Sequence, residues 1–225
     1  MEKLLKLQAQ VSQLQAELAR SRKETGDLED RLLIATDHAT FDPRTRLYRR
    51  EVFEDTVREM LGGGVSGAFV LIDLQGFGAI NEEFGHPTGD QMIAHAADAI
   101  RRRMRVRKRV HRLEDSYCRL GGDEFAALLA EVSEDQVVQI VGAINAEAQK
   151  IDRRLMFHYG YAICKPEDTF ETLYERADQY LWTYKEQVKS EKRRKKAEAI
   201  IPEISPLILN GRLEEATQLL ADLLK

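Results

Sequence analysis

The sequence predicts an α+β domain in which helices flank a central, mainly antiparallel sheet, and three observations support this fold class. The run Ala68 to Leu74 is apolar enough for a strand buried on both faces. Two further apolar runs flank a Gly-Gly turn between Cys118 and Leu129, which is the pattern of a β-hairpin. From Thr45 on, helical segments alternate with strands. We expect one domain with appendages from the 225 residues.

Residues 1–35 carry a heptad repeat that predicts an N-terminal helix. Its a and d positions hold Leu4, Leu7, Val11, Leu14, Leu18, Ser21, Thr25, Leu28, Leu32 and Ala35. Most of these are apolar and the intervening residues are largely charged or amide side chains, as a two-stranded coiled coil requires. We expect a homodimer through this coil; the alternative is one amphipathic helix packed on its own domain. The seam is weakest at Ser21, Thr25 and Gly26.

Residues 36–198 are expected to form the globular domain. The predicted helices are Arg49 to Leu61, Ile80 to Phe84, Asp90 to about Lys108, Glu134 to Lys150 and Phe170 to about Lys196, and the predicted strands are Ala68 to Leu74, the two hairpin strands and Leu155 to Cys164. A triple glycine at 62–64 ends the first helix, and Asp90 is expected to be the N-cap of the third.

Residues 199–225 differ in character from the domain. Ile200-Ile201-Pro202 is expected to break the preceding helix, and Gly211 to Leu224 is amphipathic. We expect this segment to be a docking or dimer-supporting helix outside the core. The basic cluster Lys192 to Lys196 is typical of a solvated helix end. Because the net charge is −4, we expect no nucleic-acid binding.

The sequence has no apolar run of the length of a transmembrane helix or secretory signal, so we expect no membrane span. Cys118 and Cys164 lack the spacing of metal ligands and are expected to be buried thiols in a reducing compartment. These features predict a cytoplasmic protein.

The Gly121-Gly122-Asp123-Glu124 turn places two adjacent carboxylates at the tip of the hairpin. The glycines permit positive φ and let a ligand approach the backbone. Since the carboxylates repel each other, we expect a cation there, most simply a divalent metal; the alternative is an ordinary polar turn. Asp73 ends the apolar strand upstream. If that strand lies beside the hairpin, Asp73 and Asp123 can share metal ions, as in phosphoryl and nucleotidyl transfer.

These motifs resemble those of a known family. Gly121 to Phe125 resembles the signature of GGDEF domains, the diguanylate cyclases. Asp73 to Asp90 is similar to the family's nucleotide-binding segment almost position for position, and Ala177 to Lys185 resembles its last helix. The similarity covers about Thr36 to Lys189. It implies a fold related to nucleotide cyclase and polymerase palm domains.

In its N-terminal motif and its nucleotide-binding segment, the sequence departs from the family pattern at four positions. Within Asp42 to Arg50, which resembles the family's N-terminal motif, Arg46 stands where Gly is usual and Arg49 where Asn is usual. Gly78 replaces a phosphate-contacting lysine, and Gln75 replaces a frequent second aspartate. Loss of one cationic contact should weaken triphosphate binding but removes no metal ligand, so reduced activity is expected rather than none.

The resemblance implies that two GTP molecules, one per subunit, condense to cyclic di-GMP and two pyrophosphates. Each 3′-hydroxyl would attack the α-phosphate of the other nucleotide in line. Asp73, the backbone carbonyl of Leu74 and Asp123 would hold Mg²⁺ (or Mn²⁺), which lowers the pKa of the hydroxyl. Asp123 matches the base and Glu124 an accessory metal ligand. For Asp73 the alternative is a simple strand-end cap.

The resemblance also implies a set of substrate contacts. Asn81 and Asp90 match the residues that recognise guanine, and a carboxylate can accept from N1–H and N2–H₂ together, a donor pair that adenine lacks. His86 matches a substrate contact, Lys185 aligns with a phosphate-binding lysine, and Lys189 is expected to bind substrate at a position where Arg is usual. The alternatives are a helix N-cap for Asp90, turn residues for Asn81 and His86, and exposed helix lysines.

Arg112-Leu-Glu-Asp115 has the spacing from Gly121 of the family's product-inhibition site. Arg can pair with guanine O6 and N7 or with phosphate, and Asp with the guanine N–H edge. Cyclic di-GMP is therefore expected to act as an inhibitor as well as the product. The alternative is an i, i+3 salt bridge on the surface.

Two hypotheses about function remain. The first is an active dimeric diguanylate cyclase regulated through its coiled coil. The second is a catalytically weak or silent module that binds GTP or cyclic di-GMP and signals to a partner. The three carboxylates Asp73, Asp123 and Glu124 favour the first hypothesis, and Gly78 with Arg46 and Arg49 keeps the second open.

Overall fold

Five strands form one sheet in the order β1-β3-β4-β2-β5. The strands are β1 (Tyr48–Arg49), β2 (Gly67–Leu74), β3 (Ser116–Gly121), β4 (Glu124–Ala130) and β5 (Phe157–Ile163). The short β1 runs parallel to β3, and the other pairs are antiparallel. The predicted mainly antiparallel sheet is confirmed. The structure, a computed structural model, describes residues 2–64, 66–103 and 115–224.

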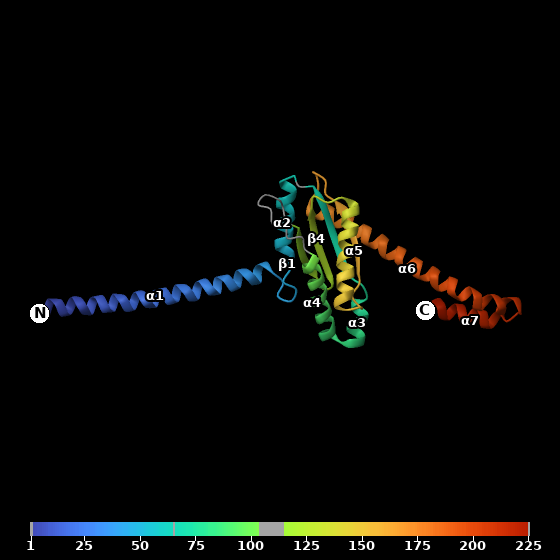
Figure 1. Cartoon of the computed structure of the whole chain (residues 1–225), viewed down its shortest axis with the longest axis horizontal. Coiled ribbons are helices and arrows are strands. Elements are labelled where there is room, and N and C mark those ends of the chain that lie inside the picture. Colours follow the sequence, from blue (N-terminus) through green and yellow to red (C-terminus); the bar gives the residue numbers. More distant parts are fainter. Residues whose placement is uncertain (1, 65, 104–114, 225) are drawn as a thin grey trace.

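Seven helices lie within the described residues. They are α1 (Glu2–Thr40), α2 (Arg50–Gly62), α3 (Phe77–Phe84), α4 (His86–Arg103), α5 (Glu134–Ile151), α6 (Phe170–Leu209) and α7 (Leu213–Leu224). In Figure 1, α1 leaves the domain on one side and the second half of α6 leaves it on the other, where α7 folds back along α6.

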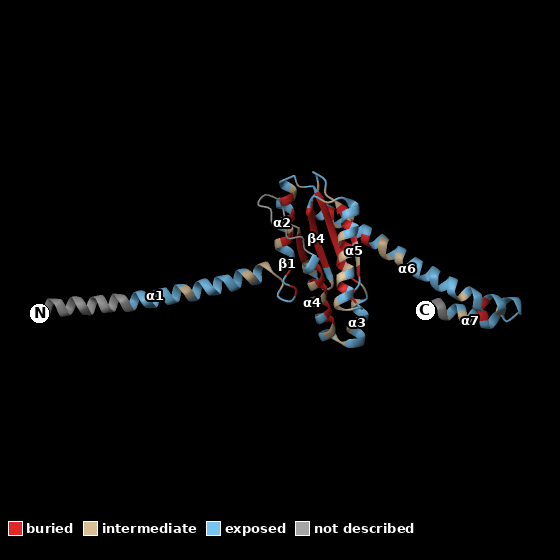
Figure 2. Ribbon diagram, in the orientation of Figure 1, coloured by how far each residue is buried: buried red, intermediate tan, exposed pale blue. Residues whose placement is uncertain are grey.

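Strand β2 lies inside the sheet and is buried on both faces, as its apolar run predicts. Val70 and Ile72 join a cluster with residues of α4 and α5. Phe69 and Leu71 join a second cluster with residues of α2 and α6. Helices therefore cover both faces of the sheet, and the buried residues concentrate in its strands (Figure 2).

Helix α4 begins at His86, so Asp90 lies in its second turn and is not the N-cap that the sequence predicts. Gly85, with a φ of +82°, is the C-cap of α3, and α4 begins at the next residue. Pro87 then occupies the first turn of α4, where its fixed φ and missing N–H are favourable. This proline is the better signal for the start of the helix.

Helix α6 passes through Pro202 and Pro206, so the predicted break near residue 200 is wrong. The helix is supported there by α7, since Ile204 and Ala216 are buried where the two helices pack. This packing offsets the backbone hydrogen bonds that the prolines cannot make. The expected boundary between residues 198 and 199 lies inside a continuous helix.

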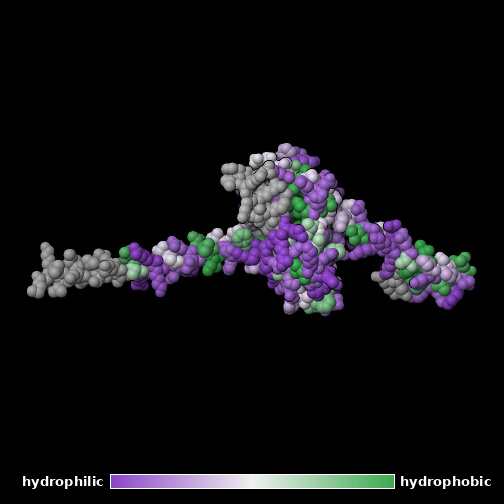
Figure 3. Space-filling model, viewed as in Figure 1, coloured by the Kyte–Doolittle hydropathy of each residue, from purple (hydrophilic) through white to green (hydrophobic). Residues whose placement is uncertain are grey.

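Helix α1 runs without a break through Gly26 and ends at Thr40, five residues beyond the expected limit of the coil. Leu18, Leu28 and Leu32, on the heptad seam, are 53%, 63% and 68% exposed. Apolar surface interrupts the polar surface of this helix (Figure 3). The seam residues of the described part of α1 are therefore not packed on the chain's own domain, and the coiled coil stays a prediction.

Both cysteines are free thiols, Cys118 buried and Cys164 partly buried. Among the described residues, none of the helices combines the length and the apolar character needed to cross a lipid bilayer.

Candidate active site

Three polar residues lie side by side across the sheet at the end of β2. Asp73 of β2 is the direct cross-strand partner of Glu124 on β4 and of His158 on β5. Directly opposed residues of neighbouring strands point to the same face of the sheet. The Asp73 carboxylate on β2 therefore lies between the Glu124 carboxylate on β4 and the His158 imidazole on β5.

Asp123 lies at the tip of the β3–β4 hairpin and is linked to the end of β2. Its carbonyl oxygen accepts a hydrogen bond of 3.2 Å from the backbone N–H of Leu74. Gly122 adopts a φ of +49°, which favours glycine at this turn. Asp73, Leu74, Asp123 and Glu124, the predicted metal ligands, therefore meet at one edge of the sheet.

Arg119 holds the hairpin tip in place. Its Nε and Nη2 donate to the carbonyl oxygen of Gly122, at 3.1 and 2.8 Å, and its Nη1 lies 3.4 Å from Oδ2 of Asp42. The guanidinium joins the tip to the turn that precedes β1. This contact holds the backbone of the turn that carries Asp123.

Lys185 reaches the carboxylates from α6. Its Nζ lies 2.8 Å from Oδ2 of Asp73, and the Lys185 side chain is about one-third exposed. Gly160 on β5 allows this approach, because a Cβ there would lie 2.0 Å from the carbonyl oxygen of Ala177. The close packing of α6 on β5 places the Lys185 ammonium group over the acidic site.

Burial raises the pKa of Asp123, and the negative charge of Asp73 adds to this effect. Burial also raises the pKa of Glu124, with further contributions from Asp73 and Asp123. Lys185 opposes both shifts without cancelling them. The site therefore carries excess negative charge, which a divalent cation would neutralise.

The carboxylate set fits Mg²⁺ or Mn²⁺. Within the described ranges, no three His, Cys, Asp or Glu side chains are arranged so that they could hold a metal ion by themselves. Mg²⁺ does not need such a group, since it is usually held by one or two carboxylates together with substrate phosphates. Oxygen donors from Asp73, Asp123, Glu124 and the Leu74 carbonyl are the hard ligands that it prefers.

Asn81 and Asp90, the predicted guanine contacts, come together through Gly89. A Cβ at Gly89 would lie 1.9 Å from Oδ1 of Asn81 and 3.1 Å from Cε2 of Phe77. The Asn81 amide therefore lies directly over the Gly89 backbone, next to Asp90. Its Oδ1 is buried and has no hydrogen-bond partner among the described residues. An unpaired acceptor of this kind fits a site that is completed by a ligand.

Replacing Gly89 with Ala is expected to weaken about tenfold the GTP binding that the family resemblance implies, because Asn81 must turn away from the new methyl group. The clash involves a side-chain end, so the fold should persist. Nucleotide titration and circular dichroism measure the two effects. Gly78→Ala is the matched control, since a Cβ at Gly78 meets no atom within 4 Å. If Gly89→Ala bound GTP with wild-type affinity, the assignment of Asn81 as a nucleotide contact would be wrong.

Of the other predicted residues, His86 and Asp115 lie outside this group, whereas Lys189 lies near enough to His158 for its charge to help lower the pKa of that imidazole. His86 is an exposed residue at the start of α4. Lys189 lies one turn beyond Lys185 and pairs with Glu186, at 2.8 Å. Asp115 lies at the far end of the hairpin, where its Oδ1 accepts from the Ala130 N–H at 3.2 Å. The roles assigned to these residues stay predictions.

A family model described as diguanylate cyclase, GGDEF domain, matches residues 39–191. The chain belongs to the GGDEF family. It is 29% identical over 151 residues to the probable diguanylate cyclase DgcJ of Escherichia coli, and 26% identical over 172 residues to the diguanylate cyclase VdcA of Vibrio cholerae. These matches cover 64% and 72% of this chain, but only 29% and 49% of the two relatives.

Among solved structures, the coiled coil and GGDEF domain of DgcB from Caulobacter crescentus, in complex with c-di-GMP, is similar to this chain. The two share 26% identity with a TM-score of 0.68, and the match covers 77% of this chain and 95% of that one. The fold and the presence of an N-terminal helix before the GGDEF domain agree with the predictions from sequence.

The turn before β1 explains one departure from the family pattern. Arg46, where the GGDEF family usually has Gly, adopts a φ of +57°, a conformation that glycine tolerates best. Its guanidinium pairs with Asp37 near the end of α1, with Nη2 2.8 Å from Oδ1, and lies over the Phe41 ring. These contacts offset the backbone strain and tie α1 to the domain.

Sequence reasoning missed three residues of this GGDEF site. They are Arg44, which pairs with Asp90, His158, which lies opposite Asp73, and Arg119, which holds the hairpin tip. The pKa of His158 is lowered by burial, against the opposing effect of Asp73. His158 reaches the site through the cross-strand register of β5 with β2, and Arg44 through a contact between segments that are distant in the sequence. The spacing of residues along the sequence therefore gives no signal for either. Arg112, the other residue of the predicted inhibitory pair, lies outside the described residues.

Proposed function

We propose that this chain is a diguanylate cyclase that condenses two GTP molecules into cyclic di-GMP and two pyrophosphates as a homodimer. The observation that carries the proposal is the direct cross-strand pairing of Asp73 with Glu124, with Asp123 at the adjacent tip. Membership of the GGDEF family and the names of the relatives support the same chemistry.

The acidic edge binds the triphosphate in this proposal. A divalent cation held by Asp73, Asp123, Glu124 and the Leu74 carbonyl would supply charge neutralisation and a lowered pKa for the attacking hydroxyl. Asp123 takes the 3′-hydroxyl proton as general base. The hydroxyl oxygen then forms a bond to the α-phosphorus of the other nucleotide, and the bond to pyrophosphate breaks.

Lys185 exchanges partners when substrate binds. In the described structure its Nζ pairs with Asp73 at 2.8 Å, so it lies within reach of any phosphate bound at that carboxylate. A lysine is a compact point charge on a flexible stem and can move between the two anions. Lys185 thereby takes over part of the role of the family lysine that Gly78 replaces, while Lys189 and His86 provide further contacts at the rim.

Asp90 and Asn81 select guanine at the opposite end of the nucleotide. The Asp90 carboxylate accepts from N1–H and N2–H₂, and the Asn81 amide bonds remaining atoms of the base edge. Each subunit binds one GTP, so the cyclic product needs two facing sites. The exposed leucines of α1 would supply the dimer through a coiled coil.

We place this reaction in the cytoplasm. Both cysteines are free thiols, and the absence of disulfides among the described residues agrees with a reducing compartment that also holds GTP and Mg²⁺.

Product feedback is a further part of the proposal. Cyclic di-GMP bound at Arg112 and Asp115 would slow the enzyme, and Arg112→Ala should relieve that inhibition without lowering the initial rate. Initial rates with and without added micromolar product measure the effect. Arg102→Ala is the matched control, because Arg102 is an exposed arginine of α4 that pairs with Glu147 of α5. If cyclic di-GMP inhibited the wild type, Arg112→Ala and Arg102→Ala equally, Arg112 would have no role in product inhibition.

The test of the proposed function is incubation of purified full-length protein with GTP and Mg²⁺, followed by mass analysis. Cyclic di-GMP should accumulate with GTP, no cyclic dinucleotide should form from ATP, and chelation of Mg²⁺ should stop the reaction with GTP. A protein that binds GTP or cyclic di-GMP but forms no product over hours would instead be the signalling module.

A further inference from the structure

An ion pair joins two distant segments at the predicted guanine site. Arg44 lies on the turn between α1 and β1, and Asp90 lies in the second turn of α4. Nη1 of Arg44 donates to Oδ1 of Asp90. The turn that follows α1 and helix α4 therefore approach each other at this point. Nothing in the sequence pattern predicted a cation beside Asp90.

The backbone of Arg44 is held in place by its turn. Oδ1 of Asp42 accepts from the N–H of Arg44 at 3.1 Å, and from both the N–H and the hydroxyl of Thr45 at 2.8 Å. Arg101 donates to the Thr45 carbonyl, and Thr45 is fully buried. The guanidinium therefore extends from an anchored backbone toward α4.

The pair has unused hydrogen-bonding capacity that faces solvent. The side chains of Arg44 and Asp90 are 41% and 49% exposed. Within the described residues, Arg44 uses Nη1 on Asp90, which leaves the other guanidinium donors and the second carboxylate oxygen available. Donors and acceptors thus stand next to each other, close to the buried, unpaired Oδ1 of Asn81.

We propose that Arg44 is a specificity-determining residue that binds O6 and N7 of guanine while Asp90 binds N1–H and N2–H₂ of the same base. This inference rests on the proposed use of GTP. Guanine presents N7, O6, N1–H and N2–H₂ in that order, two acceptors followed by two donors. Arg44 and Asp90 offer two donors followed by two acceptors. The bond between them need not break, since the guanidinium has further donors and each oxygen of the Asp90 carboxylate can accept a second hydrogen bond.

The same array rejects adenine at two positions. The adenine N6–H₂ group would place donors against the donors of Arg44, and its N1 would place an acceptor against the Asp90 carboxylate. Unpaired or opposed polar groups discriminate more strongly than the loss of apolar contacts. Arg44 thereby adds a second point of discrimination to the one that Asp90 supplies.

The N7 contact can be tested without turnover by comparing 3′-deoxy-GTP with its 7-deaza analogue. Both lack the attacking hydroxyl, and they differ only in the acceptor that Arg44 would bind. In titrations of the full-length protein with Mg²⁺, we expect the 7-deaza analogue to bind about tenfold more weakly. In Arg44→Leu, both nucleotides should bind equally and more weakly than 3′-deoxy-GTP binds the wild type.

Two further variants sharpen the result. Arg44→Lys keeps the charge but loses the planar fork, so its preference for N7 should be smaller than that of the wild type. Arg58→Leu removes an exposed arginine of α2 that pairs with Glu54 and Asp55, and should leave the preference unchanged. The comparison of the two nucleotides on wild-type protein needs no variant to fold.

The outcomes separate this inference from the proposed function. Equal binding of the two nucleotides by the wild type, or an undiminished preference in Arg44→Leu, would overturn the role of Arg44 while leaving GTP as substrate. Failure of the wild type to bind either nucleotide would overturn the proposed function and the inference together.

Discussion

Asp123→Asn is expected to abolish cyclic di-GMP formation, with a loss of at least about a thousandfold, or roughly 4 kcal/mol in the activation free energy. Two functions are removed at once. A neutral amide is a poor ligand for a hard cation, and it cannot accept the 3′-hydroxyl proton. The backbone role of Asp123 persists, because its carbonyl oxygen, not its side chain, accepts from Leu74.

The stability of this variant distinguishes chemistry from unfolding. Burial and Asp73 raise the folded-state pKa of Asp123, so its ionisation destabilises the folded protein as pH rises through that pKa. The amide that replaces the carboxylate would carry no such charge. Without added metal, we expect the variant to melt at the wild-type temperature or above it at neutral pH, and the difference should vanish in acid, below the ordinary pKa of aspartate.

Glu175→Gln is the matched control for Asp123→Asn. Glu175 is exposed on α6 and lines an open groove of about 470 Å³ that Glu124 and Lys185 also line. It changes the charge near the site by the same amount without touching the proposed ligand set. Its rate should stay close to wild type. Wild-type turnover by Asp123→Asn would refute the assigned chemistry.

The sheet was predictable because its signals are local. The apolar run of β2 and the glycine turn of the hairpin each specify one element, and the alternation of elements leaves few ways to pack them. The same locality made Asp73, Asp123 and Glu124 recognisable, since each carboxylate stands at the end of a strand or in a turn.

The predictions from sequence failed where contacts between distant elements determine the local structure. Pro202 ends many helices, yet α7 supports α6 through it. Asp90 has the side chain of a good N-cap, but Gly85 and Pro87 start α4 one turn earlier. The partners of Arg44 and Arg46 lie on other elements, at Asp90 and Asp37, so the sequence could mark Arg46 as unusual without giving its contact.

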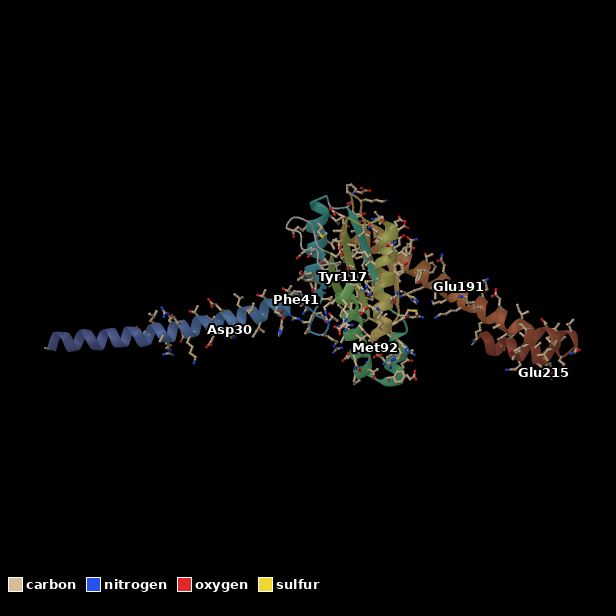
Figure 4. All side chains as sticks on the ribbon, viewed as in Figure 1. Asp30, Phe41, Met92, Tyr117, Glu191 and Glu215 are labelled. Carbon is tan, nitrogen blue, oxygen red and sulfur yellow. The ribbon has the colours of Figure 1, made fainter. Side chains whose placement is uncertain are left out.

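The join between α1 and the domain is built from side chains that follow residue 35. Asp37 pairs with Arg46, and Phe41 stacks on Tyr48 with ring centroids 5.2 Å apart. Figure 4 labels Asp30 on the free helix and Phe41 where it meets the domain. A rotation of α1 would thus be passed directly to the turn that also holds Arg44 and, through Asp42, Arg119.

Removing residues 1–35 is expected to leave a folded, GTP-binding protein whose cyclase rate depends steeply on protein concentration. The cut keeps the Asp37 and Phe41 contacts, so the domain should retain its structure. It removes the seam that would hold two GTP sites face to face, and the encounter of two subunits then becomes part of the reaction. Ultracentrifugation with an activity titration measures both properties.

Two variants of the full-length protein, a double substitution on the seam and a single control, test the same coil without a deletion. Leu28→Asp with Leu32→Asp places charges on the predicted seam, at residues that are 63% and 68% exposed in the single chain. Leu33→Asp, at a residue 70% exposed but off the seam, is the control and should stay dimeric. If the truncated protein and the seam variant both remained dimeric and fully active at nanomolar concentration, dimerisation would lie elsewhere, and helix α7 would be the next segment to remove.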